Sequence, residues 1–199
     1  MFPVLAVRDP VKARKALTAN FGWVEDGKLM RLGEQAILIS GIGEFPKDFM
    51  ALPLDHVALD VSDADSAYRT FSARGATLSK RYTPNGPRDI PEFWEHGVRF
   101  VFFEAPEGWP LEFCAENGRR MRNNSFGHSH YGIRCQSVEN LERDLVSRGA
   151  SRISEYSLGS GPDIVTVVFL RFGTAILELF DEPPFAVDHN EGWIGLAKP

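Results

Sequence analysis

Residues 54–77 read LDHVALDVSDADSAYRTFSARGAT, and residues 128–151 read HSHYGIRCQSVENLERDLVSRGAS. The second stretch repeats the first at an offset of 74 positions, which places His56 on His130. The same offset aligns the tripeptide Arg-Gly-Ala at 74–76 with its copy at 148–150. Agreement at several positions with one offset indicates two copies of a structural unit.

An amphipathic helix is predicted in each copy. Apolar residues recur at positions i, i+3 and i+7, namely Ala64, Ala67 and Phe71 in the first copy and Val138, Leu141 and Leu145 in the second. This is the spacing of one buried helix face. We expect Ser62 and Ser137 near the helix N-caps and the glycine of Arg-Gly-Ala as the left-handed stop. Each copy is therefore a short strand followed by a helix.

Two further strands are expected after each helix, joined by a tight turn: 97–104 with 110–115, and 165–172 with 174–180. Glu112 in the first copy aligns with Glu178 in the second at an offset of 66. The offset falls from 74 because the first copy carries a longer insertion at 83–95, which is rich in proline and charge.

A weaker third copy opens the chain. Residues 30–40 echo residues 170–180, and Pro10, Ala13 and Leu17 occupy helical core positions. Aligning the strands puts Phe2 at the histidine position and Ile39 at the glutamate position, so this copy lacks the polar pair. The alternation of strands and short helices predicts an α+β fold of tandem β-α-β-β-β modules. We assign residues 1–50 to a degenerate module, 51–118 and 126–183 to two site-bearing modules, and 184–199 to a C-terminal tail.

The recurring polar residues predict a metal site. A lone carboxylate in an apolar strand, such as Glu112 or Glu178, is costly to bury unless it is paired or bound to metal. Two imidazoles and two carboxylates suit a first-row ion such as Ni, Co, Zn, Mn or Fe better than Ca or Mg. We therefore predict one divalent transition metal ion, with four protein ligands: His56, Glu112, His130 and Glu178.

Other polar residues have competing interpretations. His128 shares a strand face with His130 and is the alternative ligand, but the offset favours His130. Arg134 lies on the same face and is predicted to bind a substrate carboxylate or phosphate; pairing with Asp60 is the alternative. His96 is interpreted as a surface histidine, and no role is assigned to His189.

Several residues could line a cavity beside the metal. Cys114 shares a face with Glu112, and aromatic residues are candidates for an apolar wall, although each could equally be core: Phe100, Phe102, Phe103, Trp109 and Phe113. The basic linker 117–125 is interpreted as solvated, with an anion-binding lip as the alternative.

Composition narrows the class of protein. The 199 residues are 43% hydrophobic and 25% charged, as in a soluble globular protein. A net charge of −5 argues against nucleic acid or an anionic membrane as the main partner. Two cysteines, no signal peptide and no apolar run of about 20 residues lead us to expect a cytoplasmic protein without disulfides.

These motifs resemble those of the vicinal oxygen chelate superfamily, which includes glyoxalase I, methylmalonyl-CoA epimerase, extradiol dioxygenases, and fosfomycin- and bleomycin-resistance proteins. Its modules carry a histidine in the first strand and a glutamate in the last. Residues 102–113, FFEAPEGWPLEF, are similar to the family's last hairpin, with Ala105 in place of the first acidic residue. The resemblance covers about residues 54–182 and implies curved mixed sheets around a cup-shaped metal site.

The ligand order His, Glu, His, Glu looks most like bacterial-type glyoxalase I. The resemblance implies an enzyme with isomerase or lyase chemistry on a small substrate with adjacent oxygens. It implies Glu178 or Glu112 as the general base, with Glu178 preferred. A ring-cleaving extradiol dioxygenase is the alternative, although it uses two histidines and one carboxylate, so the extra Glu112 counts against it. A metal-free binding or resistance protein with the same cup is a further alternative.

A homodimer is expected, because the strands of the first module have no obvious partner and would leave an open edge. The sequence leaves open whether the two site-bearing modules pair within one chain or between chains.

Overall fold

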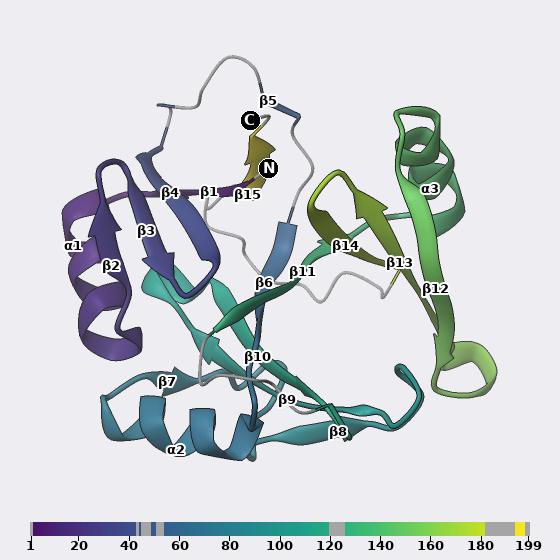
Figure 1. Ribbon diagram of the computed structural model, residues 1–199, viewed down its shortest axis with the longest axis horizontal. Helices are drawn as coiled ribbons and strands as arrows, with labels where there is room; N and C mark the ends of the chain where they lie inside the picture. Colours follow the sequence, from purple (N-terminus) through teal and green to yellow (C-terminus); the bar gives the residue numbers. More distant parts are fainter. Residues whose placement is uncertain are drawn as a thin grey trace.

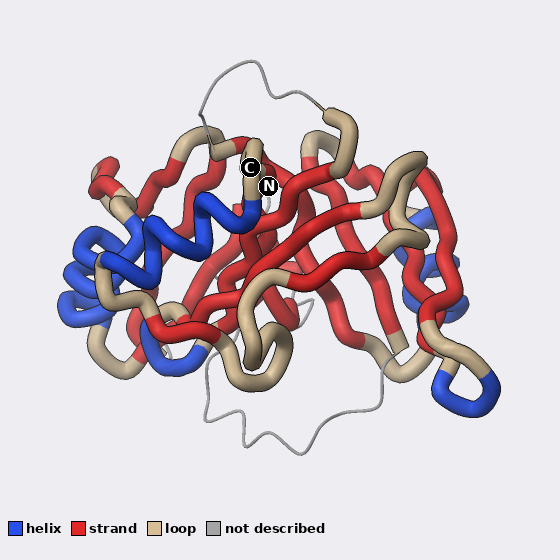
Figure 2. The backbone as a smooth tube through the Cα atoms, turned by 90° about the horizontal axis from the view of Figure 1, so that it is seen from below, coloured by secondary structure: helices blue, strands red, loops and turns tan. Residues whose placement is uncertain are grey.

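The computed structural model describes residues 2–42, 44, 49–50, 54–119, 126–181 and 194–197. His189, linker residues 120–125 and most of the predicted tail lie outside the described residues. Strands fill the middle of the molecule and helices lie at its two ends (Figure 1, Figure 2). None of the described helices is long and apolar enough to cross a membrane.

A nine-stranded sheet is built from the second and third modules, in the order β12-β13-β14-β11-β6-β10-β9-β7, with β8 also paired to β9. Its strands are β6 (Leu54–Asp60), β7 (Thr77–Leu78), β8 (Arg88–Ile90), β9 (Val98–Glu104), β10 (Pro110–Glu116), β11 (Gly127–Arg134), β12 (Ser151–Leu158), β13 (Val165–Phe172) and β14 (Ala175–Phe180). The two modules meet where β6 pairs with β11 in antiparallel fashion. They therefore pair within one chain, which the sequence had left open.

A six-stranded sheet is built around the first module, in the order β2-β3-β4-β1-β15-β5. Its strands are β1 (Phe2–Val7), β2 (Val24–Asp26), β3 (Leu29–Leu32), β4 (Gln35–Gly41), β5 (Phe49–Met50) and β15 (Ile194–Ala197). The β1 edge that we expected to be open is covered by β15 of the same chain. An open edge on β1 is therefore no longer a reason for the expected homodimer, which stays a prediction.

The helices follow the predicted apolar spacing and glycine stops. They are α1 (Pro10–Ala16), which continues as a π-helical turn (Leu17–Phe21), α2 (Ala64–Ala73) and α3 (Val138–Ser147). Ser137 caps α3 as expected, but Asp63 rather than Ser62 caps α2, since the Asp63 carboxylate accepts from two backbone N–H groups. Gly75 and Gly149 take φ angles of +87° and +102° after the helices.

The two faces of the nine-stranded sheet have separate roles because side chains alternate along each strand. One face packs against α2 and the first module in the main core, where the Phe71 and Phe113 rings stack at 4.4 Å. Phe103, Trp109 and Phe113 belong to this core, so for these three residues the core alternative holds rather than the cavity wall. Phe100 and Phe102 alternate with them and lie on the opposite face, which carries the site.

The first module packs directly against the site-bearing sheet. The Gln35 amide donates to the Ala58 carbonyl at 3.3 Å, and its oxygen accepts from the Tyr131 hydroxyl at 3.0 Å. The register of this module also corrects our alignment. Leu32 pairs with Gln35 across the β3–β4 hairpin, as Phe172 pairs with Ala175, so Leu38 rather than Ile39 occupies the glutamate position. Leu38 pairs with Val4, as Glu178 pairs with Gly132, and Phe2, two residues before Val4, keeps the histidine position. The predicted loss of both ligands from this module is unchanged.

Candidate metal centre

Strand register brings the four predicted ligands onto one face of the sheet. Gly132 on β11 pairs with Glu178 on one side and with His56 on the other. In the second copy of this arrangement, Ala58 on β6 pairs with Glu112 and with His130. Ala58 and Gly132 are themselves related by the offset of 74. Two small residues therefore lie at the centre of the site, and each is flanked by one imidazole and one carboxylate.

The ligand atoms converge on one point. The Nε2 atoms of His56 and His130 are 3.2 Å apart. The Glu112 Oε2 atom lies 3.3 and 3.2 Å from these two nitrogens, and the Glu178 Oε2 atom lies 3.2 and 3.3 Å from them. All four side chains are buried.

These separations fit a metal ion. Zinc-to-ligand bonds of about 2.1 Å separate neighbouring ligand atoms by about 3.0 Å in an octahedron and about 3.4 Å in a tetrahedron. Ligand atoms of His56, His130 and Glu178 all lie within 4.8 Å of one another, as a shared ion requires. Glu112 is a fourth candidate ligand, because its Oε2 atom lies close to the Nε2 atoms of both imidazoles. The donor set and its spacing therefore suit one divalent ion.

The charge balance also favours a cation at this point. Burial lowers the pKa of His130, but Glu178 and Glu112 outweigh that effect and raise the pKa to about 9. Burial raises the pKa of Glu178, yet the charge of His130 brings it down to about 2. The same opposing influences raise the pKa of His56 and lower that of Glu112. Two buried carboxylates thus hold positive charge between them, which a metal ion supplies when it displaces the imidazole protons.

A buried carboxylate orients one imidazole. The His56 Nδ1 atom lies 3.1 Å from Asp55 Oδ1, so a proton on Nδ1 leaves the Nε2 lone pair directed at the site. The His130 Nδ1 atom lies 3.0 Å from the Ser129 hydroxyl. Burial raises the pKa of Asp55, but hydrogen bonds from His56 and Tyr82 hold it well below its usual value. Asp55 therefore stays ionised beside the imidazole.

Sequence reasoning missed Asp55. Strict alternation along β6 places it on the face away from His56, and the second copy has Ser129 at the equivalent position. The signal that could have revealed it is an aspartate beside a predicted ligand histidine in an otherwise apolar strand.

Arg134 contacts this carboxylate rather than the cavity. Its Nε and Nη2 atoms each lie 3.1 Å from Asp55 Oδ2, and its guanidinium lies 5.3 Å from the Phe180 ring centroid. It is absent from the described residues that line the cavity over the ligands. This geometry does not support the predicted contact with substrate. The alternative partner Asp60 instead faces Arg119 at 3.3 Å.

The other histidines lie outside the ligand group. The Nδ1 atom of His128 is 2.9 Å from the Gln35 amide nitrogen, and its Nε2 accepts from the Ile176 N–H. Burial lowers the pKa of His128 to about 4, so this ring is neutral. His96 is largely exposed, as expected for a surface residue.

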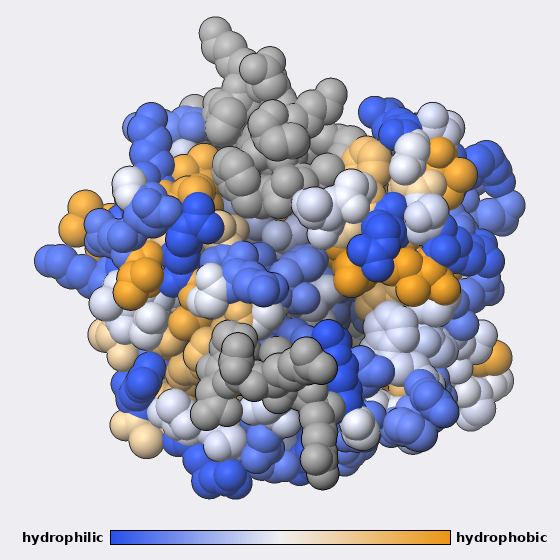
Figure 3. Space-filling model, in the orientation of Figure 1, coloured by the Kyte–Doolittle hydropathy of each residue, from blue (hydrophilic) through white to orange (hydrophobic). Residues whose placement is uncertain are grey.

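A cavity of about 450 Å³ opens over the ligands. Cys114, Phe100 and Phe102 line it, as the sequence suggested. Part of its wall comes from the insertion, at residues 88–94, for which the sequence predicted no such role. On the face seen in Figure 3, apolar side chains gather over β12 and β13, beside a hydrophilic centre.

Metal removal is expected to destabilise the protein. A ligand that binds only the folded state at 100 times its dissociation constant adds about 2.7 kcal/mol. Chelation of the purified protein should lower Tm, and restoring one equivalent of Ni, Co or Zn should recover it. His56→Ala should abolish this response, whereas His96→Ala, at a surface histidine, should keep it. Equal Tm values with and without metal would contradict the site.

Asp55→Asn is expected to weaken metal binding by about 10- to 100-fold, the usual cost of losing a partner of a ligand imidazole. Competition with a chromophoric chelator measures this affinity. Asp65→Asn is the matched control, because Asp65 also pairs with an arginine but on the surface. Unchanged affinity in Asp55→Asn would show that His56 does not need this carboxylate.

Gly132→Ala is expected to expel the His56 ring from the site. A Cβ atom at Gly132 would lie 2.1 Å from His56 Cε1, closer than any non-bonded contact allows. Gly127→Ala on the same strand places its Cβ 3.3 Å from Asp60 Cβ, which a small shift relieves. Metal stoichiometry should fall in the first variant and persist in the second. Full metal binding by folded Gly132→Ala would contradict the position of His56.

Comparison with known proteins shows similarity at the level of structure. The sequence matches no protein-family model and no curated protein. Glyoxalase I from Zea mays matches with a TM-score of 0.61 and 18% identity, over 98% of this chain and 70% of that one. Methylmalonyl-CoA epimerase from Mycobacterium tuberculosis matches with a TM-score of 0.50 and 18% identity, over 71% and 95%.

A mutant of 4-hydroxymandelate synthase from Streptomyces coelicolor matches with a TM-score of 0.50 and 12% identity, over 96% of this chain and 94% of that one. All three are members of the superfamily that the sequence motifs resemble. The α+β architecture of curved mixed sheets is the one that they share. This chain therefore has the fold of the vicinal oxygen chelate superfamily.

Proposed function

We propose that this chain is a metal-dependent enzyme that acts on a small substrate with adjacent oxygens through isomerase or lyase chemistry. The observation that carries the proposal is the convergence of two imidazoles and two carboxylates at 3.2–3.3 Å on the floor of a cavity. The ligand order His, Glu, His, Glu and the shared fold support it. A metal ion bound there would polarise the substrate oxygens and acidify the adjacent C–H bond.

The two glutamates are the proton-transfer groups in this proposal. Both line the cavity, and both have lowered pKa values, so each is an ionised carboxylate that can accept a proton. We assign the base to Glu178, the glutamate preferred from the sequence; its cross-strand neighbour Phe169 lines the cavity. Glu112 pairs across strands with Phe102 and remains a ligand.

Aromatic rings pack against both imidazoles. Phe102 packs edge-on against the His56 ring at 5.0 Å, and Phe169 packs against the His130 ring at 5.6 Å. These rings keep the base and the ligands in apolar surroundings, where charge interactions are stronger than in water.

Ring-cleaving dioxygenation is the second candidate. His56, His130 and Glu178 supply two imidazoles and one carboxylate, the ligand set of non-haem Fe(II) oxygenases. Oxygen consumption with catechols under Fe(II) would favour this function. Loss of hemithioacetal absorbance with Ni or Co would favour the isomerase.

Glu178→Gln is expected to lower kcat by about 10²–10⁴-fold, the usual contribution of a general base. Metal stoichiometry should remain near one, since three ligands persist. Glu112→Gln should lower metal affinity more than kcat at saturating metal, and the surface variant Glu25→Gln should leave both unchanged. If no metal is retained after reconstitution, or if no turnover is found with any of the five metals, the proposed function is wrong.

A further inference from the structure

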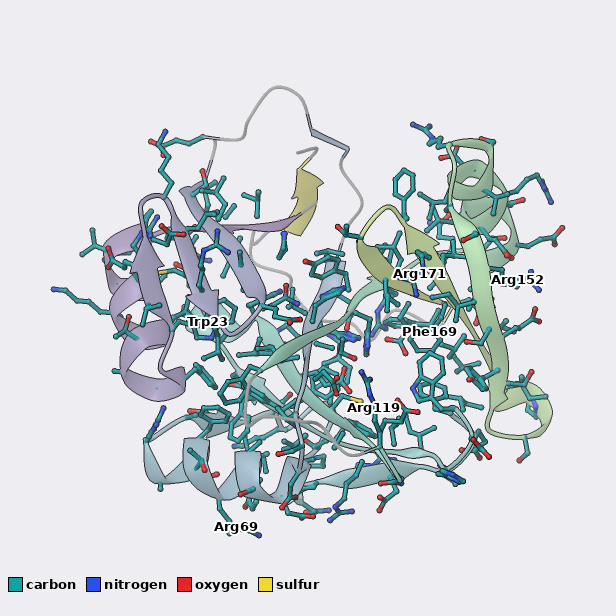
Figure 4. The ribbon with its side chains drawn as sticks, in the orientation of Figure 1. Trp23, Arg69, Arg119, Arg152, Phe169 and Arg171 are labelled. Carbon is teal, nitrogen blue, oxygen red and sulfur yellow. The ribbon has the colours of Figure 1, made fainter. Side chains whose placement is uncertain are left out.

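The insertion of the second module crosses the cavity and contacts the third module. After β8 the chain turns inward, and the Phe93 ring lies 4.9 Å from the ring of Tyr156 and 5.4 Å from that of Phe169. The Trp94 ring lies 5.0 Å from that of Phe169, which is labelled on β13 in Figure 4. The wall of the cavity is therefore completed by contact between two modules.

The backbone fixes Trp94 in this position. Its φ angle is +56°, in the left-handed region that bulky residues rarely adopt. The Trp94 N–H donates to the Tyr156 hydroxyl at 3.0 Å. A strained backbone of this kind persists only where the surroundings determine it, and it is concentrated at ligand-binding sites. The local backbone conformation and this hydrogen bond therefore hold the Trp94 ring at the cavity wall.

The wall is aromatic and carries no excess of positive charge. The apolar residues that form it include Ile90, Phe93, Trp94, Phe100, Phe102 and Phe169. Among the described residues, Arg88 is the only arginine or lysine that lines the cavity. The acidic residues Asp89 and Glu92 line it as well. Arg88 also donates to the Tyr82 carbonyl at 3.2 Å. This surface suits a flat apolar group and gives no preference to a phosphate.

We propose that the cavity accepts a substrate whose pair of adjacent oxygens carries an aryl group, and that Phe93 and Trp94 determine this specificity. The inference rests on the proposed function, because the oxygens are held at the metal ligands. The cavity volume of about 450 Å³ lies in the range of small-molecule sites. Rings stack edge-on or offset at centroid distances such as those already present between Phe93, Trp94 and Phe169.

Two hydroxamates test the proposal without turnover. Acetohydroxamate and benzohydroxamate chelate a metal through the same two oxygens and differ only in a methyl or phenyl group. On the Ni-loaded protein, calorimetry should show benzohydroxamate binding at least tenfold more tightly, because the phenyl group buries more apolar area. Trp94→Ala and Phe93→Ala should each remove most of this preference and leave acetohydroxamate affinity within about twofold of wild type.

Two further variants keep the test decisive. Phe93→Leu retains apolar volume but removes the ring, so it tests the ring if an alanine variant does not fold. Phe172→Ala is the matched control, because Phe172 lies on the same strand as Phe169 but packs into the other core.

The outcomes separate the two proposals. If the protein retains no metal, neither hydroxamate binds, and the proposed function falls together with the inference drawn from it. If metal is bound but the two probes bind equally, only the aryl assignment is overturned. Retention of the benzohydroxamate preference in both Trp94→Ala and Phe93→Leu would likewise overturn it.

Discussion

The antiparallel pairing of β6 with β11 is the constraint on which the rest of the structure depends. This one register sets His56 opposite Gly132 and His130 opposite Ala58, so the two imidazoles approach to 3.2 Å. The outer strands β10 and β14 then bring one glutamate each to the same small residues. A slip of one residue would turn the histidines to the opposite face. Fold and site are therefore determined by the same backbone hydrogen bonds.

The site concentrates charge in a buried place, and its surroundings offset the cost. Isolated buried charges are unfavourable, whereas groups that are paired and hydrogen-bonded are tolerated. Asp55 is opposed by Arg134 at 3.1 Å and by Arg81 at 3.7 Å. Among the described residues, Glu112 and Glu178 form ion pairs with the two imidazoles alone. The network that supports His56 is thus complete in the protein alone, while the ligand group itself suits a cation.

The features that could be predicted from the sequence are those that occur in both copies of the repeat. Ala67 and Leu145 marked helix faces, and Glu112 and Glu178 marked equivalent strands, because each pattern occurred twice. Features present in only one copy escaped prediction: Asp55 has no acidic counterpart, and Trp94 lies in an insertion without a copy. Covering of the β1 edge depends on β15, more than 180 residues away, which no local periodicity could indicate. Strand alternation places Phe102 and Phe103 on opposite faces of the sheet, but it does not by itself say which face bears the cavity.

Joining both halves of the cup in a single polypeptide has a consequence for its shape. A site formed between two identical chains would have to repeat every feature on both sides of the symmetry axis. Here one half carries Asp55 where the other carries Ser129, and only one half carries the insertion that contains Trp94. The two modules are therefore equivalent at the four predicted ligands but differ in the residues that surround them. A molecule bound in this cavity would therefore contact different side chains on its two sides, so the site is asymmetric although its fold is repeated.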